Sequence, residues 1–235
     1  MNTIYGNKVI GNNNTISING QKCLGGKTRK VDVKKTTNAN NISRITVNCD
    51  LADIQINAVE TNNITTHFFG QLTTDGSIHF DVSVIGNEVK IVETITGSYV
   101  TSDLLSLHID IPSRMLDSIE VALNKIGNII ISEGVSVKAL RLTTENGKVK
   151  SKATFQEITA ISTNDHTKIA VNASMDIKLD LTTKNGDITV QLRNISCCQL
   201  SAKSKNGTVN NDFHASTGYT ARGKINAFNG DIKIR

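Results

Sequence analysis

Two aspartates stand where paired carboxylates could act on a glycosidic bond. Asp187 and Asp231 each directly follow the glycine of an Asn-Gly turn. Two acids facing one substrate supply the general acid and the base or nucleophile of polysaccharide hydrolases. The equivalent places beside other copies of this turn carry Lys148, Thr167 and Thr208, so the column is chemically mixed. This mixture favours solvent-facing turn residues over an acid pair, and we predict no catalytic residue.

The five histidines are scattered singly along the chain. His67 and His79 could approach each other across a hairpin and ligate a metal. No HxH, HExxH or GxSxG pattern accompanies them. We therefore predict ordinary strand or surface positions for the histidines, no metal site and no cofactor.

The cysteines, Cys23, Cys49, Cys197 and Cys198, show no CxxC spacing and no histidine at metal-ligand distance. Four free thiols fit a reducing compartment. Cys197 and Cys198 could form a vicinal redox pair, but adjacent residues of a strand point to opposite faces. That geometry favours one small core residue and one surface residue.

Positive charge is concentrated near the N-terminus, where residues 1–35 hold seven basic residues and one acidic residue. Such a segment could bind nucleic acid, anionic lipid or an acidic polymer. Its only aromatic residue is Tyr5, so stacking of bases is disfavoured and a solvated basic edge is favoured. The phrase "CLGGKT" at residues 23–28 lacks the spacer of a phosphate-binding loop, and we predict a turn there.

The first residues lack the basic and apolar regions of a secretory signal, and no later run approaches 18 apolar residues. The expectation is a cytoplasmic protein without a transmembrane segment. If a leader has been trimmed away, the cell surface becomes the expected location.

One phrase is written twice, as "LTTENGKVK" from Leu142 and "LTTKNGDITV" from Leu181. The glycine of this turn, followed along the chain, marks six copies at spacings of 20, 19, 20, 21 and 23 residues. The markers are Gly127, Gly147, a degenerate turn at His166, Gly186, Gly207 and Gly230.

Apolar residues keep step with these markers. Five residues before them stand Ala122, Leu142, Ile161, Leu181, Ala202 and Ile225. Two residues after them stand Ile129, Val149, Lys168, Ile188, Val209 and Ile232. Lys168 is the exception, and a one-residue insertion such as a bulge in "NDHTKI" would bring Ile169 into the column.

A period near 20 residues with strand-like alternation is typical of a solenoid whose coils stack as rungs. The sequence thus predicts an all-β, single-stranded parallel β-helix. A ladder of turn residues should line one corner: Asn146, Gly147, Asn185, Gly186, Asn206, Gly207, Asn229 and Gly230. Asn-Gly is also the strongest hairpin signal, so an antiparallel meander or barrel is the competing interpretation.

The first part of the chain is rich in β-signals but less periodic. Strands are predicted in "ISRITVNCD", "ADIQINAVE", "SIHFDVSVIGNEVKIVE" and "LLSLHIDIP", with a hairpin turn at Gly86 and Asn87. No linker interrupts the sequence. We predict one solenoid domain over residues 1–235, with irregular entry coils and hairpin excursions over 1–111 and regular coils over 112–235.

The phrase "LSLHIDIPSRMLDSIEVALNKIGNIII", the recurring Asn-Gly turns and the opening "KVIGNNNTISING" carry a family likeness. Through these segments the chain resembles a bacterial β-solenoid family known as putative adhesins. That family is related to the head domains of putative autotransporter adhesins, and its function is unknown. The resemblance implies a β-solenoid fold and no agreed catalytic residues.

Three functions follow as hypotheses. The first is a non-catalytic binding or scaffold protein, adhesin-like, that presents a rigid surface to a protein or polysaccharide partner. The second is self-assembly through the end coils, because the chain ends in the strand-like "GDIKIR" with no evident cap. The third, on fold analogy alone, is a polysaccharide-active β-helix enzyme.

Overall fold

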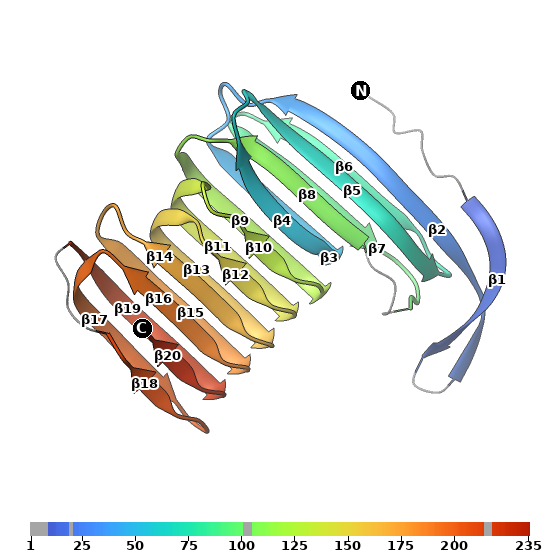
Figure 1. The fold of residues 1–235 in the computed structure, drawn as a ribbon. Coiled ribbons are helices and arrows are strands. Elements are labelled where there is room, and N and C mark those ends of the chain that lie inside the picture. The colour runs from blue at the N-terminus through green and yellow to red at the C-terminus, as the bar shows by residue number, and fades with distance from the viewer. Residues whose placement is uncertain (1–8, 19–20, 101–104, 214–217) are drawn as a thin grey trace.

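The computed structural model describes residues 9–18, 21–100, 105–213 and 218–235, with side chains from residue 27 onward. Its strands form two sheets that face each other across the core (Figure 1). In spatial order, sheet A contains β1 (Val9–Ile18), β2 (Gln21–Asn38), β5 (Asn63–Thr74), β8 (Leu105–Pro112), β4 (Asp53–Val59), β10 (Ile129–Ile131), β12 (Val149–Ser151), β14 (Thr167–Asn172), β16 (Ile188–Arg193), β20 (Ile232–Ile234) and β18 (Val209–Asn211).

Sheet B forms the opposite layer. In spatial order it contains β17 (Ile195–Ser204), β19 (Tyr219–Asn229), β15 (Ile177–Asn185), β13 (Thr154–Asn164), β11 (Ser136–Asn146), β9 (Leu116–Ile126), β3 (Arg44–Leu51), β7 (Glu88–Ile95) and β6 (Ile78–Ile85). No described residue belongs to a helix that could span a membrane.

Each coil of the solenoid is one strand of sheet B followed by one strand of sheet A. Neighbouring coils pair in parallel in both layers, as Leu142 does with Val121 and Ala160. The predicted parallel solenoid is therefore confirmed, and it has two sides. Among the described strands, the antiparallel pairing of the competing interpretation occurs only in the N-terminal part, where β6 and β7 form the predicted hairpin around Gly86.

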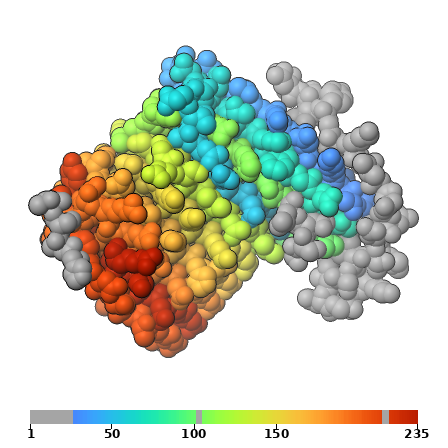
Figure 2. Space-filling view, in the orientation of Figure 1, coloured from blue at the N-terminus to red at the C-terminus, as the bar shows by residue number. Residues whose placement is uncertain are grey.

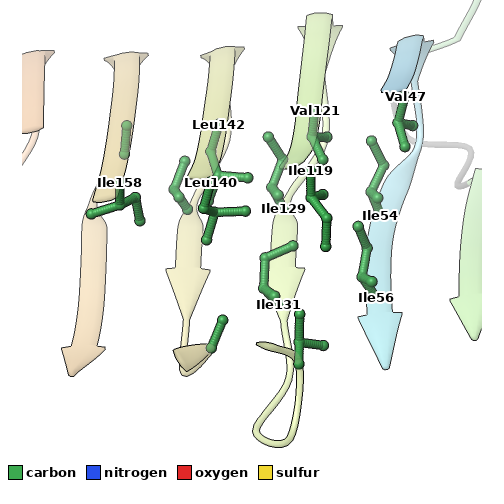
Figure 3. Packing of buried hydrophobic residues seen from close by; sticks show 14 of the residues in the cluster. Val47, Ile54, Ile56, Ile119, Val121, Ile129, Ile131, Leu140, Leu142 and Ile158 are labelled. Carbon is green, nitrogen blue, oxygen red and sulfur yellow. The ribbon is translucent and has the colours of Figure 1, made fainter. Parts of the chain in front are cut away.

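Apolar side chains alternate along the strands because successive residues of a strand point to opposite faces. Leu140 and Leu142 of β11 point inward and are almost fully buried, and Ile129 of β10 faces them from sheet A (Figure 3). Parallel register stacks each inward residue on its counterpart in the next coil. Truncating one such residue, for example Leu142→Ala, would cost about 2–5 kcal/mol because a cavity remains.

The coils are not stacked in the order of the sequence. Strand β19 lies between β15 and β17, and β20 lies between β16 and β18. The last coil of the chain is thus inserted beneath the penultimate coil, which forms the end of the stack. Figure 2 shows dark red atoms from the C-terminal part of the chain among the orange atoms of neighbouring coils. The expected open C-terminal edge at "GDIKIR" is wrong, because β20 is paired on both sides.

The N-terminal end shows the same exchange. The coil β3–β4 pairs with β9–β10 on one side and with β7–β8 on the other, although β7–β8 stands between them in sequence. Beyond β8, the antiparallel strands β5 and β2 extend sheet A. The turn predicted at residues 23–28 is wrong, since this backbone belongs to β2.

The predicted insertion in "NDHTKI" is also wrong. Asp165 has φ of 117° and takes the place of the turn glycine, one residue before the predicted marker His166. Thr167 pairs in unbroken register with Val149 and Ile188, and its side chain is buried. Lys168 consequently points outward without any bulge.

Three other residues that were predicted to lie in the core are not buried as expected. Ala160 takes the buried place predicted for Ile161, which is 43% exposed, because the marker is Asp165. Val121 takes the place predicted for Ala122, because a register shift separates β9 from β11 near the turn. Val209 is 45% exposed because β18 ends the stack.

Candidate functional site

An amide ladder runs along the corner where the coils turn from sheet B to sheet A. In four asparagine pairs, Nδ2 of one side chain donates to Oδ1 of the asparagine in the adjacent coil, and at one end Asn146 donates to the backbone oxygen of Lys125. The donor-to-acceptor pairs are Asn164 to Asn146 at 2.8 Å, Asn185 to Asn164 at 2.7 Å, Asn229 to Asn185 at 2.7 Å and Asn206 to Asn229 at 2.8 Å. Asn164 was not among the predicted ladder residues, and Asn229 lies between Asn185 and Asn206. The ladder stabilises the corner by joining the side chains of successive coils.

A second ladder occupies the place just after each turn glycine. Oδ1 of Asp187 accepts the backbone N–H of Asp231 at 2.8 Å, and Oδ1 of Asp231 accepts the N–H of Thr208 at 2.7 Å. The bond from the Thr208 N–H, joined by one from its hydroxyl, lowers the pKa of Asp231. The two aspartates predicted as turn residues thus cap the backbone of the next coil. Asn128 and His166 occupy the same place in their coils, and each accepts the backbone N–H of the next coil. The recurrence of side chains that can accept a hydrogen bond at this place in the sequence could have revealed the ladder.

The candidate metal-binding pair is separated. His67 lies on β5 of sheet A and His79 on β6 of sheet B. Nε2 of His67 lies 2.9 Å from Oδ1 of Asp32, and its ring packs 4.4 Å from that of Phe69. Among the residues with described side chains, no group of three or more potential ligands could hold a metal ion.

The described cysteine side chains lie in two different parts of the fold, Cys49 on β3 and the adjacent pair Cys197 and Cys198 on β17. Cys49 is buried in the core, where burial raises its pKa well above the usual value. Cys197 is exposed on β17, and Cys198 beside it is half-buried with a raised pKa because of that burial. The side chain of Cys23 lies outside the described residues. The side chains of the N-terminal basic segment are described from Lys27 onward, and among them Lys35 is paired with Asp81 at 3.0 Å.

A groove opens on the outer face of sheet A, where the sheet becomes wider. Strand β12 has three residues, whereas β14 beside it and β16, the next strand beyond, each have six. Pairing between β12 and β14 ends at Ile169, but pairing between β14 and β16 continues to Asn172. This step leaves a groove of about 310 Å³ beside Ser151.

Four cations line this groove: Lys150, Lys152, Lys168 and Arg193. All four side chains belong to exposed residues, and none makes a hydrogen bond or ion pair with any described residue. Glu133 is the one acidic residue in the lining. We call these five residues with Ala170, Asn172 and Gln191 the basic groove. Its excess of positive charge suits an anionic ligand.

Sequence reasoning did not select the basic groove. Lys150 and Lys152 come from one coil, and Lys168 and Arg193 come from the next two coils in the sequence, so no single motif marks the set. The unequal lengths of equivalent strands, three residues in "VKS" and six in "TKIAVN", were the available signal.

A larger hollow of about 500 Å³ follows the turn corner and is lined by ladder residues such as Asn146 and Gly147. Leu105 forms part of its wall and borders residues 101–104, which lie outside the described chain. Its described lining contains two acids, Asp53 and Asp165, whose Oδ1 atoms each accept a backbone N–H of a turn.

A known family profile matches the sequence of residues 42–235, the part of the chain that forms the two-layered stack of coils and its asparagine corner. The chain belongs to the Toastrack DUF4097 family. This Toastrack chain also resembles solved structures, and no curated protein matches it in sequence. The match over residues 42–235 includes every coil of the solenoid and the basic groove.

One solved structure is that of a "putative cell adhesion protein" from Clostridium sporogenes, with 14% identity and a TM-score of 0.54 over 87% of this chain and 98% of that one. Another is a "putative adhesin" from Bacteroides fragilis, with 15% identity and a TM-score of 0.49 over 87% and 97% of the two chains. At such low identity the likeness concerns the fold of the Toastrack chain.

Proposed function

We propose that this Toastrack protein is a non-catalytic binding protein that holds a protein or polysaccharide partner on the outer face of sheet A. The observation that carries the proposal is the basic groove, where four cations converge without an internal partner. Charged groups that the fold does not use are available to a ligand. The adhesion names given to the two structural neighbours agree with a binding role and with a place at the cell surface.

The chemistry of the acids supports binding over catalysis. Asp187 and Asp231, the best-placed carboxylates for hydrolysis, accept backbone hydrogen bonds from the next coil. A general acid needs a raised pKa, whereas the pKa of Asp231 is lowered by its bonds to Thr208. These carboxylates are therefore suited to stabilising the turns.

The architecture supports a preorganised surface. Lys150, Lys168 and Thr189 lie on adjacent strands in direct register, so their backbone positions are fixed by the ladders of sheet A. A surface fixed before binding loses little conformational freedom when a partner arrives. The groove can thus act without a lid or a moving domain.

A panel of immobilised glycans and extracellular-matrix proteins tests this function. Wild-type protein should be retained by at least one member, and the double variant Lys150→Glu/Lys168→Glu should lose that retention. The matched control is Lys184→Glu/Lys203→Glu, which reverses two exposed lysines of sheet B. Equal retention of wild type and groove variant would contradict the proposed site. Digestion by protease added to intact cells tests the proposed surface location.

The end of the stack favours self-association as a second candidate function. Strands β17 and β18 each have one described ladder partner, and Val209 is 45% exposed there. Unpaired strand edges can add a strand from another molecule. Sedimentation that shows dimers above a defined concentration, lost in Val209→Lys, would support end-to-end pairing, whereas a monomer at all concentrations would exclude it.

A further inference from the structure

We propose that the basic groove binds an acidic polysaccharide, whose carboxylate or sulfate groups lie among Lys150, Lys168 and Arg193. The inference rests on the proposed binding function and gives it a ligand class. Three features support it: the unpaired positive charge of the groove, the polar residues that line it, and the spacing of its lysines along the stack.

The charge arrangement is costly without a ligand. Lys150 and Lys168 lie directly opposite each other on adjacent strands, and like charges in such cross-strand positions are destabilising. Some lysines elsewhere have an acidic partner, as Lys125 has in Asp50 at 3.0 Å and Lys138 has in Asp117 at 2.7 Å. The groove therefore keeps its positive charge unpaired among the described residues, where an external anion can relieve the repulsion.

The lining suits a sugar better than a protein side chain. Asn172 and Gln191 supply amide donors and acceptors beside the cations, and Ala170 leaves room above the strand. Hydroxyl groups of a sugar can bond to such amides. The groove contains no aromatic residue and hence none of the large apolar anchors that dominate protein interfaces.

The cations also form a row along the stack. Lys150 and Lys168 occupy neighbouring strands, and Lys233 follows one strand beyond Thr189. Strands lie about 4.8 Å apart, so the row presents positive charges about 5 and 10 Å from one another. A regular polyanion can contact several of them at once, whereas one small anion cannot. A volume of about 310 Å³ is at the lower limit of ligand sites, so the groove holds a short stretch of the chain and the row holds its continuation.

Calorimetric titration with polygalacturonate, dextran sulfate and neutral dextran tests the inference. Wild-type protein should bind at least one of the two polyanions and not dextran, and binding should weaken as salt rises because the charges are exposed. Lys150→Glu/Lys168→Glu should weaken it at least tenfold, Lys150→Gln/Lys168→Gln less, and Lys184→Glu/Lys203→Glu less than twofold. Circular dichroism must show an unchanged fold for each variant.

Three results would overturn the ligand class. They are equal binding of dextran, equal binding by the groove and control variants, and preference for poly-glutamate or for phosphatidylserine vesicles over both polyanions. If the immobilised panel reveals a partner that depends on Lys150 and Lys168 while neither polyanion binds, the ligand class is wrong and the binding function stands. If nothing depends on these lysines, both proposals fail.

Discussion

The side-chain amide of Asn229 donates to Oδ1 of Asn185 at 2.7 Å, although the two residues are 44 positions apart. Asn206 belongs to the coil between them in sequence but lies on the far side of Asn229. The bond therefore shows that the last coil of the sequence, β19–β20, lies next to β15–β16 in the stack, and that β17–β18 lies beyond it. Because the C-terminal strand β20 is paired on both sides, it does not form an unpaired edge at the end of the stack.

Disulfide trapping can test this coil order. Lys178 pairs with Arg222 in neighbouring strands, and Arg222 pairs with Gln199. In a background lacking Cys197 and Cys198, Lys178→Cys/Arg222→Cys should cross-link upon oxidation. Lys178→Cys/Gln199→Cys should not, since two strand spacings exceed the roughly 7 Å limit between Cα atoms of a disulfide. The reverse result, seen by mass spectrometry, would show coils stacked in sequence order.

The amide ladder should stabilise the interior more than the end of the stack. The side chain of Asn164 donates to Asn146 and accepts from Asn185, whereas the exposed side chain of Asn206 makes one hydrogen bond among the described residues, to Asn229. Asn164→Ala should lower the free energy of unfolding by about 1–2 kcal/mol, and Asn206→Ala by roughly 0.5 kcal/mol. Urea denaturation measures both values, and equal losses would argue against a cooperative corner.

The turn glycines are required by close contact as well as by backbone conformation. A Cβ at Gly147, whose φ is 156°, would lie 1.7 Å from the carbonyl oxygen of Gly127. Gly147→Ala should therefore cost more than about 2 kcal/mol. Asp165 holds the equivalent place with φ of 117°, so Asp165→Gly should relieve strain and raise stability by up to about 1 kcal/mol. Thermal melting of the two variants checks the contrast, which fails if Asp165→Gly is the more harmful change.

A buried carboxyl should make stability depend on pH near neutrality. Glu93 is 2% exposed, and its Oε2 accepts the N–H groups of Asp50 and Leu51 at 2.7 and 3.0 Å. Burial raises the pKa of Glu93 from 4.5 to about 7 despite these bonds. The folded protein thus binds the proton more tightly than the unfolded chain. The resulting stabilisation is complete below pH 4.5 and is lost as pH rises to about 7, by at most about 3 kcal/mol.

Glu93→Gln should abolish that slope. Urea denaturation between pH 5 and 7.5 should show wild-type stability falling with pH while the variant stays nearly constant. The lowered pKa values of Asp50, Asp81, Asp117 and Asp231 act at more acidic pH and do not enter this window. Parallel curves for both proteins would mean that Glu93 remains ionised in the fold.

The sequence contained enough to predict parallel coils and the hairpin at Gly86, because Asn-Gly turns and alternating apolar residues are local signals. It could not reveal the coil order. Every turn carries the same chemistry, so Asn229 pairs as well with Asn185 as Asn206 would. Asp165 concealed one copy because a non-glycine residue adopts the positive φ.

The basic groove escaped prediction for a different reason. Lys150 and Lys168 meet only when equivalent strands are brought into register, and Arg193 reaches the groove because β16 is long. Comparing strand lengths between coils would have located the step, but not the lack of ion pairs between its four cations and the described acids. That absence depends on the tertiary arrangement of the described side chains.

Hydrogen exchange with mass spectrometry tests the central claim most directly, because it locates the bound partner on the molecule. The full chain would be compared with and without saturating polygalacturonate or dextran sulfate, whichever binds. We predict slower exchange in peptides covering residues 148–153, 167–173 and 188–193, with no change in the outer strands β6 and β17. Protection confined to other strands, or no protection at saturation, would contradict binding at the basic groove.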